Sequence, residues 1–294
     1  MESALALCRF AHFLSAMALF GMSLYVRLLA PPDLARALAP AARRVAAVAI
    51  PLASLSALLW VALEAASMTD SWSGLVDLDI LESVLVDTAF GAVWQWRLAI
   101  ALALLVALAL GRHGPSTFTT LFSGLLLASL CVVGHASMQH GGVGALHRAN
   151  HALHLLATGA WLGGLPPFAL CLKAYRDPAL RRDAVIAMRR FSFWGQFDVA
   201  LVALTGAANV ALTSGALPFP TTPYRALLCV KIALAATMIV IALVNRYVLA
   251  PRLKPDAPAL RILTNTSIAE VVLGVVVVAL VSVFGLLDPF LSAP

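Results

Sequence analysis

Repeated apolar stretches, each long enough to cross a lipid bilayer, limit what this 294-residue chain can fold into. A helix of about 20 apolar residues spans the roughly 30 Å hydrocarbon core of a bilayer. Because a backbone in lipid must satisfy its hydrogen bonds internally, we expect each stretch to be a helix. Only 12% of the residues are charged, against about 25% in soluble domains. The predicted fold is therefore an all-α polytopic membrane protein, a single domain (1–294) of eight transmembrane helices over residues 4–29, 43–66, 91–111, 117–138, 147–171, 188–212, 224–249 and 263–287.

The basic residues predict how these spans are oriented. Fifteen of the twenty Lys and Arg residues fall in or beside the odd-numbered connections. By the positive-inside rule these connections are cytoplasmic, so both termini and the even-numbered connections are expected on the periplasmic side. The net charge of +6 follows the topology rather than forming a basic patch, and we expect no nucleic-acid partner. The second connection, 67–90, is acidic and is expected to contain an amphipathic helix on the outer surface.

Histidines are concentrated at the predicted outer face. Five of the seven fall within residues 135–154, and three of these recur at helical spacing i, i+4 and i+7, which places them on one face. His12 enters from the outer side on the first span, at a depth comparable to that of His154. Since polar groups within a membrane usually serve a function and imidazole is a common metal ligand, we predict a metal site formed by His12, His135, Met138, His140, His147, His151 and His154.

Simpler interpretations of these residues remain open. His140 and His147 could be solvated loop residues, and His151 and His154 could form hydrogen bonds between helices. His113, in a short cytoplasmic turn, is expected to have no function. Thiol and thioether groups from Cys8, Cys131, Met17 and Met22 accompany the imidazoles. This mixture of soft and intermediate donors favours copper, as Cu(I) or Cu(II), over hard cations.

Further charged groups are predicted deep in the membrane. Asp198 and Glu270 fall near the middle of their spans, and Lys231 and Arg97 carry the opposite charge within spans. Isolated charges there cost several kcal/mol, so we expect either interhelical ion pairs or a wet route. In the second interpretation, Asp198, Glu270, Lys231 and Asn209 line a path for an ion or proton leading inward from the histidines.

Several motifs together resemble one protein family. The segments RFAHFLSAMALFG (9–21), DTAFGAVWQWR (87–97), GHASMQHG (134–141) and HALHLLATGAWLGGLPPF (151–168) are similar to segments of the copper-resistance protein D (CopD) family of bacterial inner-membrane proteins. The resemblance extends to 190–210, 224–234 and 245–253, and so covers nearly the whole chain.

The resemblance implies a multi-pass protein of the bacterial inner membrane that handles copper together with periplasmic copper-binding proteins of the CopC type. We therefore expect transport or delivery of copper ions and no enzymatic activity. Two alternatives remain open. One is a b-type haem oxidoreductase with His12 and His154 as axial ligands. The other is an assembly factor that delivers copper without transporting it.

Overall fold

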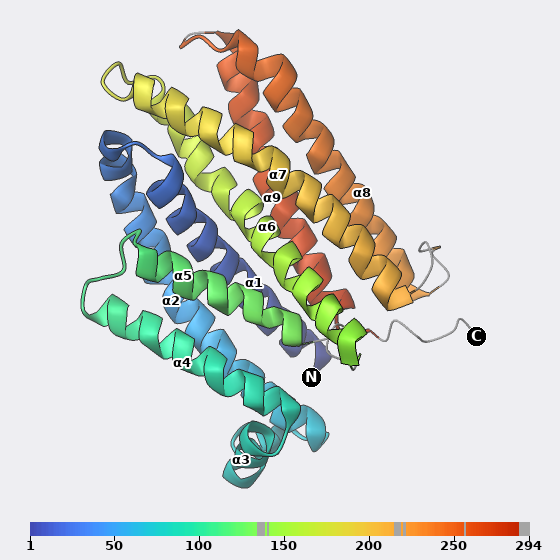
Figure 1. Ribbon diagram of the computed structural model, residues 1–294. Helices are drawn as coiled ribbons and strands as arrows, with labels where there is room; N and C mark the ends of the chain where they lie inside the picture. The colour runs from blue at the N-terminus through green and yellow to red at the C-terminus, as the bar shows by residue number, and fades with distance from the viewer. Residues whose placement is uncertain (134–138, 140, 215–218, 220–221, 256, 288–294) are drawn as a thin grey trace.

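The computed structural model describes residues 1–133, 139, 141–214, 219, 222–255 and 257–287, and this part of the chain contains helices but no strands. The helices alternate in direction and pack side by side as one bundle (Figure 1). Short π- and 3₁₀-helical segments extend or connect several of them, including π-helices at Tyr25–Leu29 and Asn245–Leu249. The α-helices are α1 (Glu2–Leu24), α2 (Pro32–Met68), α3 (Leu78–Val86), α4 (Ala89–Ala109), α5 (Thr117–Ala128), α6 (Gly141–Ala174), α7 (Arg181–Ser214), α8 (Pro223–Val244) and α9 (Pro258–Phe284).

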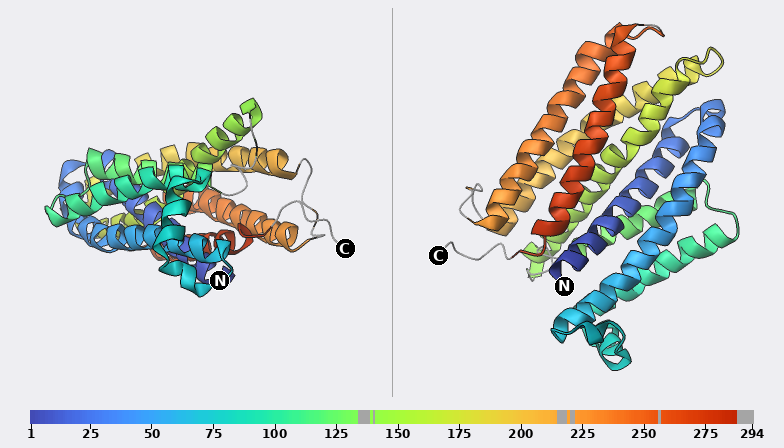
Figure 2. Two further views of the ribbon diagram at one scale, coloured as in Figure 1. Left: turned by 90° about the horizontal axis from the view of Figure 1, so that it is seen from below. Right: turned by 180° about the vertical axis from the view of Figure 1, so that it is seen from behind.

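Helices α1 and α6 form the centre of the bundle. Helix α1 packs against α2, α5, α6 and α9, and α6 packs in addition against α7. Helix α4 covers α2 and α5, and α8 covers α9 at the opposite side (Figure 2). Helices α2, α4 and α5 lie on one side of the α1–α6 pair, and α7 to α9 lie on the other (Figure 1).

Two glycines allow α1 and α6 to approach closely. A Cβ atom added to Gly21 would lie 2.2 Å from the carbonyl carbon of Gly163, and one added to Gly163 would lie 2.2 Å from the carbonyl oxygen of Met17. Small residues are characteristic of close helix contacts in membranes, where van der Waals packing drives association. This crossing fixes the relative position of the two halves of the bundle.

Seven of the described helices are long and apolar enough to cross a membrane. The expected fourth span is shorter over its described part. It consists of twelve α-helical residues in α5 and a four-residue 3₁₀ turn, Ser129–Val132. Helix α6 begins at Gly141, six residues before the predicted start of the fifth span at 147. The prolines Pro166 and Pro167 lie within α6 without ending it.

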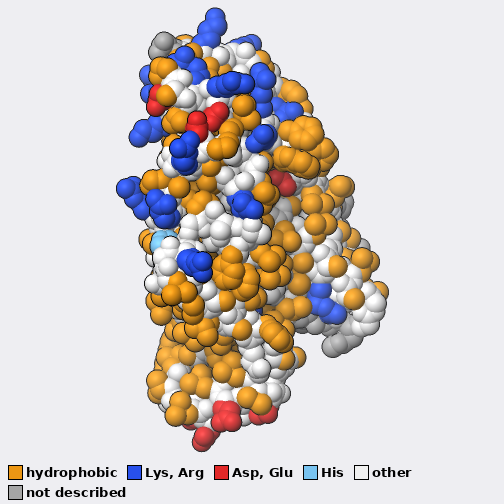
Figure 3. All heavy atoms as spheres, turned by 60° about the vertical axis from the view of Figure 1, so that its left-hand side comes forward, with side chains coloured by type: hydrophobic (Ala, Val, Ile, Leu, Met, Phe, Trp, Pro, Cys, Tyr) orange, Lys and Arg blue, Asp and Glu red, His pale blue; other side chains and the backbone are white. Residues whose placement is uncertain are grey.

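The two ends of the bundle differ in charge (Figure 3). Lys and Arg side chains gather over one end, where α6 ends and α7 begins. At the opposite end, α3 lies within the 67–90 connection and presents the exposed carboxylates of Asp77, Asp79, Glu82 and Asp87. The first residues of α1 and the last residues of α9 lie at this acidic end. The positive-inside rule assigns the basic end to the cytoplasm.

Candidate metal and ion sites

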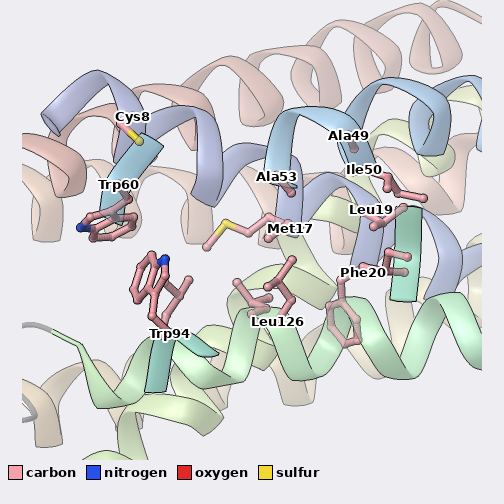
Figure 4. Close-up of a cluster of buried hydrophobic side chains, with 14 of the residues drawn as sticks. Cys8, Met17, Leu19, Phe20, Ala49, Ile50, Ala53, Trp60, Trp94 and Leu126 are labelled. Atoms are coloured by element: carbon pink, nitrogen blue, oxygen red, sulfur yellow. The ribbon is translucent and has the colours of Figure 1, made fainter. Parts of the chain in front are cut away.

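His12 is completely buried among α1, α2 and α4. Trp60 and Trp94 flank it, with ring centroids 5.9 and 6.5 Å from that of the imidazole. Figure 4 shows these two indoles beside each other in the apolar core, near the thiol of Cys8. The Cys8 thiol donates a hydrogen bond to the carbonyl oxygen of Ser56. His12 therefore lies in a rigid aromatic environment rather than in an open channel.

Both ring nitrogens of His12 have hydrogen-bond partners. Nδ1 lies 3.1 Å from the carbonyl oxygen of Ala53, an acceptor, so this nitrogen carries the proton. Nε2 consequently bears the lone pair, and it accepts a hydrogen bond from Nη2 of Arg97. The Arg97 guanidinium is itself completely buried and also donates to Leu126 and Ser129. In this arrangement the metal-binding lone pair of His12 is occupied by a cationic group.

A second polar cluster, which we call the α6–α7 seam, comprises His147, Asn150, His151 and His154 of α6 with Thr205 and Asn209 of α7. Nδ1 of His154 lies 2.9 Å from Oγ1 of Thr205. The Asn150 amide donates to the carbonyl oxygen of Thr205 and to Oδ1 of Asn209, each at 2.9 Å. The rings of His151 and His154 are stacked, with their centroids 6.3 Å apart. The seam thus gathers three imidazoles, two amides and one hydroxyl on facing helices.

The hydrogen bonds of the seam fix the tautomer of His154. The Thr205 hydroxyl donates its proton to the carbonyl oxygen of Leu201 at 2.5 Å, so it accepts the hydrogen bond from Nδ1–H of His154. Nε2 of His154 then carries the lone pair. Metal-ligating histidines usually donate their other N–H in this way, which sets the orientation of the ring. The hydrogen bond from Nδ1 of His154 thus matches the arrangement that is usual in metal-bound histidines, whereas Nε2 of His12 is engaged by Arg97.

The other histidines of the seam are also oriented by amides. Asn209 presents its Nδ2 group 3.3 Å from Nδ1 of His151, because its Oδ1 already accepts from Asn150. His147 is 3% exposed and lies in the second turn of α6, so it is not a solvated loop residue. Its Nδ1 lies 3.1 Å from Oε1 of Gln139, whose Nε2 donates to the carbonyl oxygen of Leu212.

The structure separates His12 from the α6–α7 seam. His12 contacts residues of α2 and α4, whereas His154 contacts α7, so the two imidazoles do not face each other. Within the described part of the chain, no group of three or more His, Cys, Asp and Glu side chains is close enough to hold one metal ion. The predicted ligands His135, Met138 and His140 lie outside the described residues.

Sequence reasoning missed the polar partners of the seam. Asn150 lies three residues after His147, so the helical spacing that selected the histidines also applies to Asn150. Thr205 and Gln139 gave no such signal, because their role depends on which helix packs against α6. Asn209, predicted as part of the ion route, contacts Asn150 and His151 within the seam.

Glu270 belongs to a third polar cluster, between α8 and α9. Its side chain is 2% exposed, and its Oε2 accepts a hydrogen bond from Asn245 at 2.8 Å. The Asn245 Oδ1 in turn accepts from the Thr266 hydroxyl at 2.6 Å. Asn245 begins the π-helix that extends α8, and such helical irregularities are frequent at functional sites. The other carboxyl oxygen, Oε1, is buried without a hydrogen-bond partner among the described residues.

The intramembrane charges do not pair with one another. Between described residues, the one ion pair joins Arg36 to Asp33 at the surface. The ammonium group of Lys231 approaches the ring of Phe284 at 5.8 Å. Asp198 lies on α7 seven residues before Thr205, and therefore on the same helix face, about 10 Å nearer the basic end. Interhelical ion pairs therefore do not explain why these charged residues lie within the membrane-spanning helices.

Comparison with known proteins identifies the family. The family "Copper resistance protein D-like, N-terminal domain" matches residues 1–145, and the family "Copper resistance protein D" matches residues 185–284. "Inner membrane protein YebZ" of Escherichia coli (strain K12) is 36% identical over 96% of this chain and 97% of its own length. The chain belongs to the copper-resistance protein D family.

Two further relatives extend this comparison. "Copper resistance protein D" of Pseudomonas syringae pv. tomato is 29% identical over 100% of this chain and 99% of its own length. "Copper transport protein CutJ" of Bacillus subtilis (strain 168) is 30% identical over 57% of this chain and 32% of its own length. No solved structure matches the chain. Together with the apolar helices, the family membership establishes a multi-pass inner-membrane protein.

Proposed function

We propose that this protein transports or delivers copper ions at the bacterial inner membrane and that the α6–α7 seam binds the copper on the periplasmic side. The observation that carries the proposal is the hydrogen bond from Nδ1 of His154 to Thr205, since it directs the other ring nitrogen to a ligand. Two relatives are named for copper resistance and copper transport, which supports copper as the substrate. Imidazole accepts either oxidation state of copper.

The placement of the polar groups supports a path from the periplasm inward. Copper, handed over by a periplasmic protein of the CopC type, first meets the acidic surface of α3 and the segment that contains His135, Met138 and His140. It then passes to the seam at His147, His151 and His154. Asn209 belongs to the seam itself, and Asp198, Glu270 and Lys231 are proposed as the charged groups along the further path of the copper. Oε1 of Glu270 is buried without a hydrogen-bond partner among the described residues, which supports a role in carrying a proton or cation.

His12 has a different part in this proposal. Arg97 holds the ring nitrogen that would bind copper, and the positive guanidinium repels a metal cation. We therefore assign His12 to a closed site. Its imidazole can bind copper only when Arg97 moves away. This arrangement gives no support to the haem alternative, in which His12 and His154 bind one iron from opposite sides.

The test uses purified protein in liposomes, with copper uptake as the measurement. Thr205→Val removes the hydroxyl that orients His154 and keeps the shape of the side chain. Loss of such an orienting partner typically weakens metal binding by about 10- to 100-fold, and we expect uptake at low copper concentration to fall correspondingly. His154→Ala should abolish it.

Thr158→Val is the matched control. The Thr158 hydroxyl donates to the backbone carbonyl of His154 at 2.6 Å and leaves the ring untouched. This variant should transport at the wild-type rate. Equal uptake by the Thr205 and Thr158 variants would contradict the assignment of His154. Copper binding without any uptake by the wild-type protein would favour the non-transporting delivery factor.

A further inference from the structure

A small cavity lies at the basic end of the bundle, far from the α6–α7 seam. The last turns of α1, the first half of α2, the start of α5 and the connection between α4 and α5 line it, and it is partly open to the outside. The centre of a water-sized group can move within about 10 Å³ of this cavity. This is enough space for one small ligand. The residues around it include Met22, Ser23, Ala42, His113, Pro115 and Thr119.

His113, which lines this cavity, has an unsatisfied ring nitrogen. Its Nδ1 atom is buried and has no hydrogen-bond partner within the described part of the chain. The nearby hydroxyls are already engaged, because Ser23 bonds to Thr120 at 2.7 Å and Thr119 donates to the carbonyl oxygen of Gly114 at 2.9 Å. A buried polar atom without a partner costs about 1–3 kcal/mol, and each such atom requires an explanation, such as a bound ion or water.

Met22 gives the cavity a soft donor. Its side chain is 4% exposed and lines the same space as the His113 ring. An imidazole nitrogen with a thioether sulfur suits Cu(I), whereas Mg²⁺ and Ca²⁺ prefer oxygen ligands. Among the described residues, no carboxylate lines the cavity, and the exposed Arg112 precedes His113 in the chain. Without a negative charge in its lining, the cavity accommodates a monovalent cation more readily than a divalent one.

From this geometry we infer that His113 and Met22 bind a soft monovalent cation, Cu(I), at the cytoplasmic end of the bundle. The inference rests on the proposed function, in which copper is the substrate, and it adds a second site on the opposite side of the membrane from the seam. His12 and Met22 are ten residues apart on α1, or about 15 Å along the helix. The cavity is therefore placed where copper leaves or enters the protein on the cytoplasmic side.

The experiment titrates the purified full-length protein with Ag(I), a redox-stable probe for Cu(I), and measures the number of ions bound. His113→Ala and Met22→Leu should each lose one equivalent relative to the wild-type protein. Met22→Leu conserves the volume of a buried side chain and should fold normally. The sulfur contribution to the ligand shell of bound silver should also fall in this variant, as measured by X-ray absorption.

Two further variants complete the design. Met68→Leu, which changes an exposed methionine at the acidic end, should bind silver as the wild type does. The variant with both His151→Ala and His154→Ala should retain the equivalent that His113 and Met22 bind. Wild-type silver binding by His113→Ala and Met22→Leu would overturn this inference, with water then the occupant of the cavity. Normal uptake by the His151/His154 variant would instead refute the proposed function and leave the cytoplasmic site standing.

Discussion

The contact between α1 and α6 gives a quantitative test of the fold, because Gly163 has no room for a side chain. In Gly163→Ala, the new Cβ would lie 2.2 Å from the carbonyl oxygen of Met17 and 2.9 Å from Cα of Gly21. Ordinary contact begins at 3.4 Å, so the two helices must separate by about 1.2 Å. Both of these atoms belong to the backbone of α1, so neither can move unless the helix itself moves.

Overpacking of this kind costs about 1–3 kcal/mol. The gain in helix propensity from Gly to Ala, about 1 kcal/mol, offsets only part of it. We therefore expect Gly163→Ala to lower the apparent melting temperature of the detergent-purified protein by several degrees, measured by thermal unfolding under reducing conditions. Gly195→Ala is the control on α7, where an added Cβ meets nothing within 4 Å. A Gly163→Ala protein as stable as this control would refute the described contact.

Three further predictions concern the buried polar groups. Arg97→Gln should destabilise the protein by about 1–3 kcal/mol, because carbonyl and imidazole acceptors lose their donor; a melting curve identical to that of the wild type would contradict this network. Glu270→Gln keeps an oxygen for the Asn245 amide, so the melting temperature should be preserved while copper uptake falls; unchanged uptake would remove Glu270 from the path. Purified protein should show no Soret absorption band, and a strong band would favour haem.

Much of the fold could be predicted from the sequence. The apolar stretches predicted an all-helical membrane protein because lipid leaves the backbone no other common solution. Helix ends were less predictable. The fifth span was expected to start at 147, but α6 starts at Gly141, because residues 141–146 continue the helix beyond the strongly apolar stretch. The family resemblance was confirmed by the matches to residues 1–145 and 185–284.

For the candidate site, the sequence could predict only which residues of a single helix lie together. Spacing placed His151 and His154 together, since it depends on helix geometry alone. Depth along the membrane also placed His12 near the level of His154, but depth does not determine which way a helix is rotated. In the structure His12 faces α2 and α4, where Arg97 occupies its ring nitrogen. Thr205 could not be predicted because tertiary packing decides which helix faces α6.

The most direct test of the account is copper analysis of the purified protein after equilibration with Cu(I), comparing the wild type with the variant that carries both His151→Ala and His154→Ala. The account predicts that the variant loses at least one bound copper, together with imidazole nitrogen in the copper ligand shell, while its helical circular-dichroism spectrum stays unchanged. The same copper content, affinity and ligand shell in both proteins would contradict the assignment of the α6–α7 seam as the copper site.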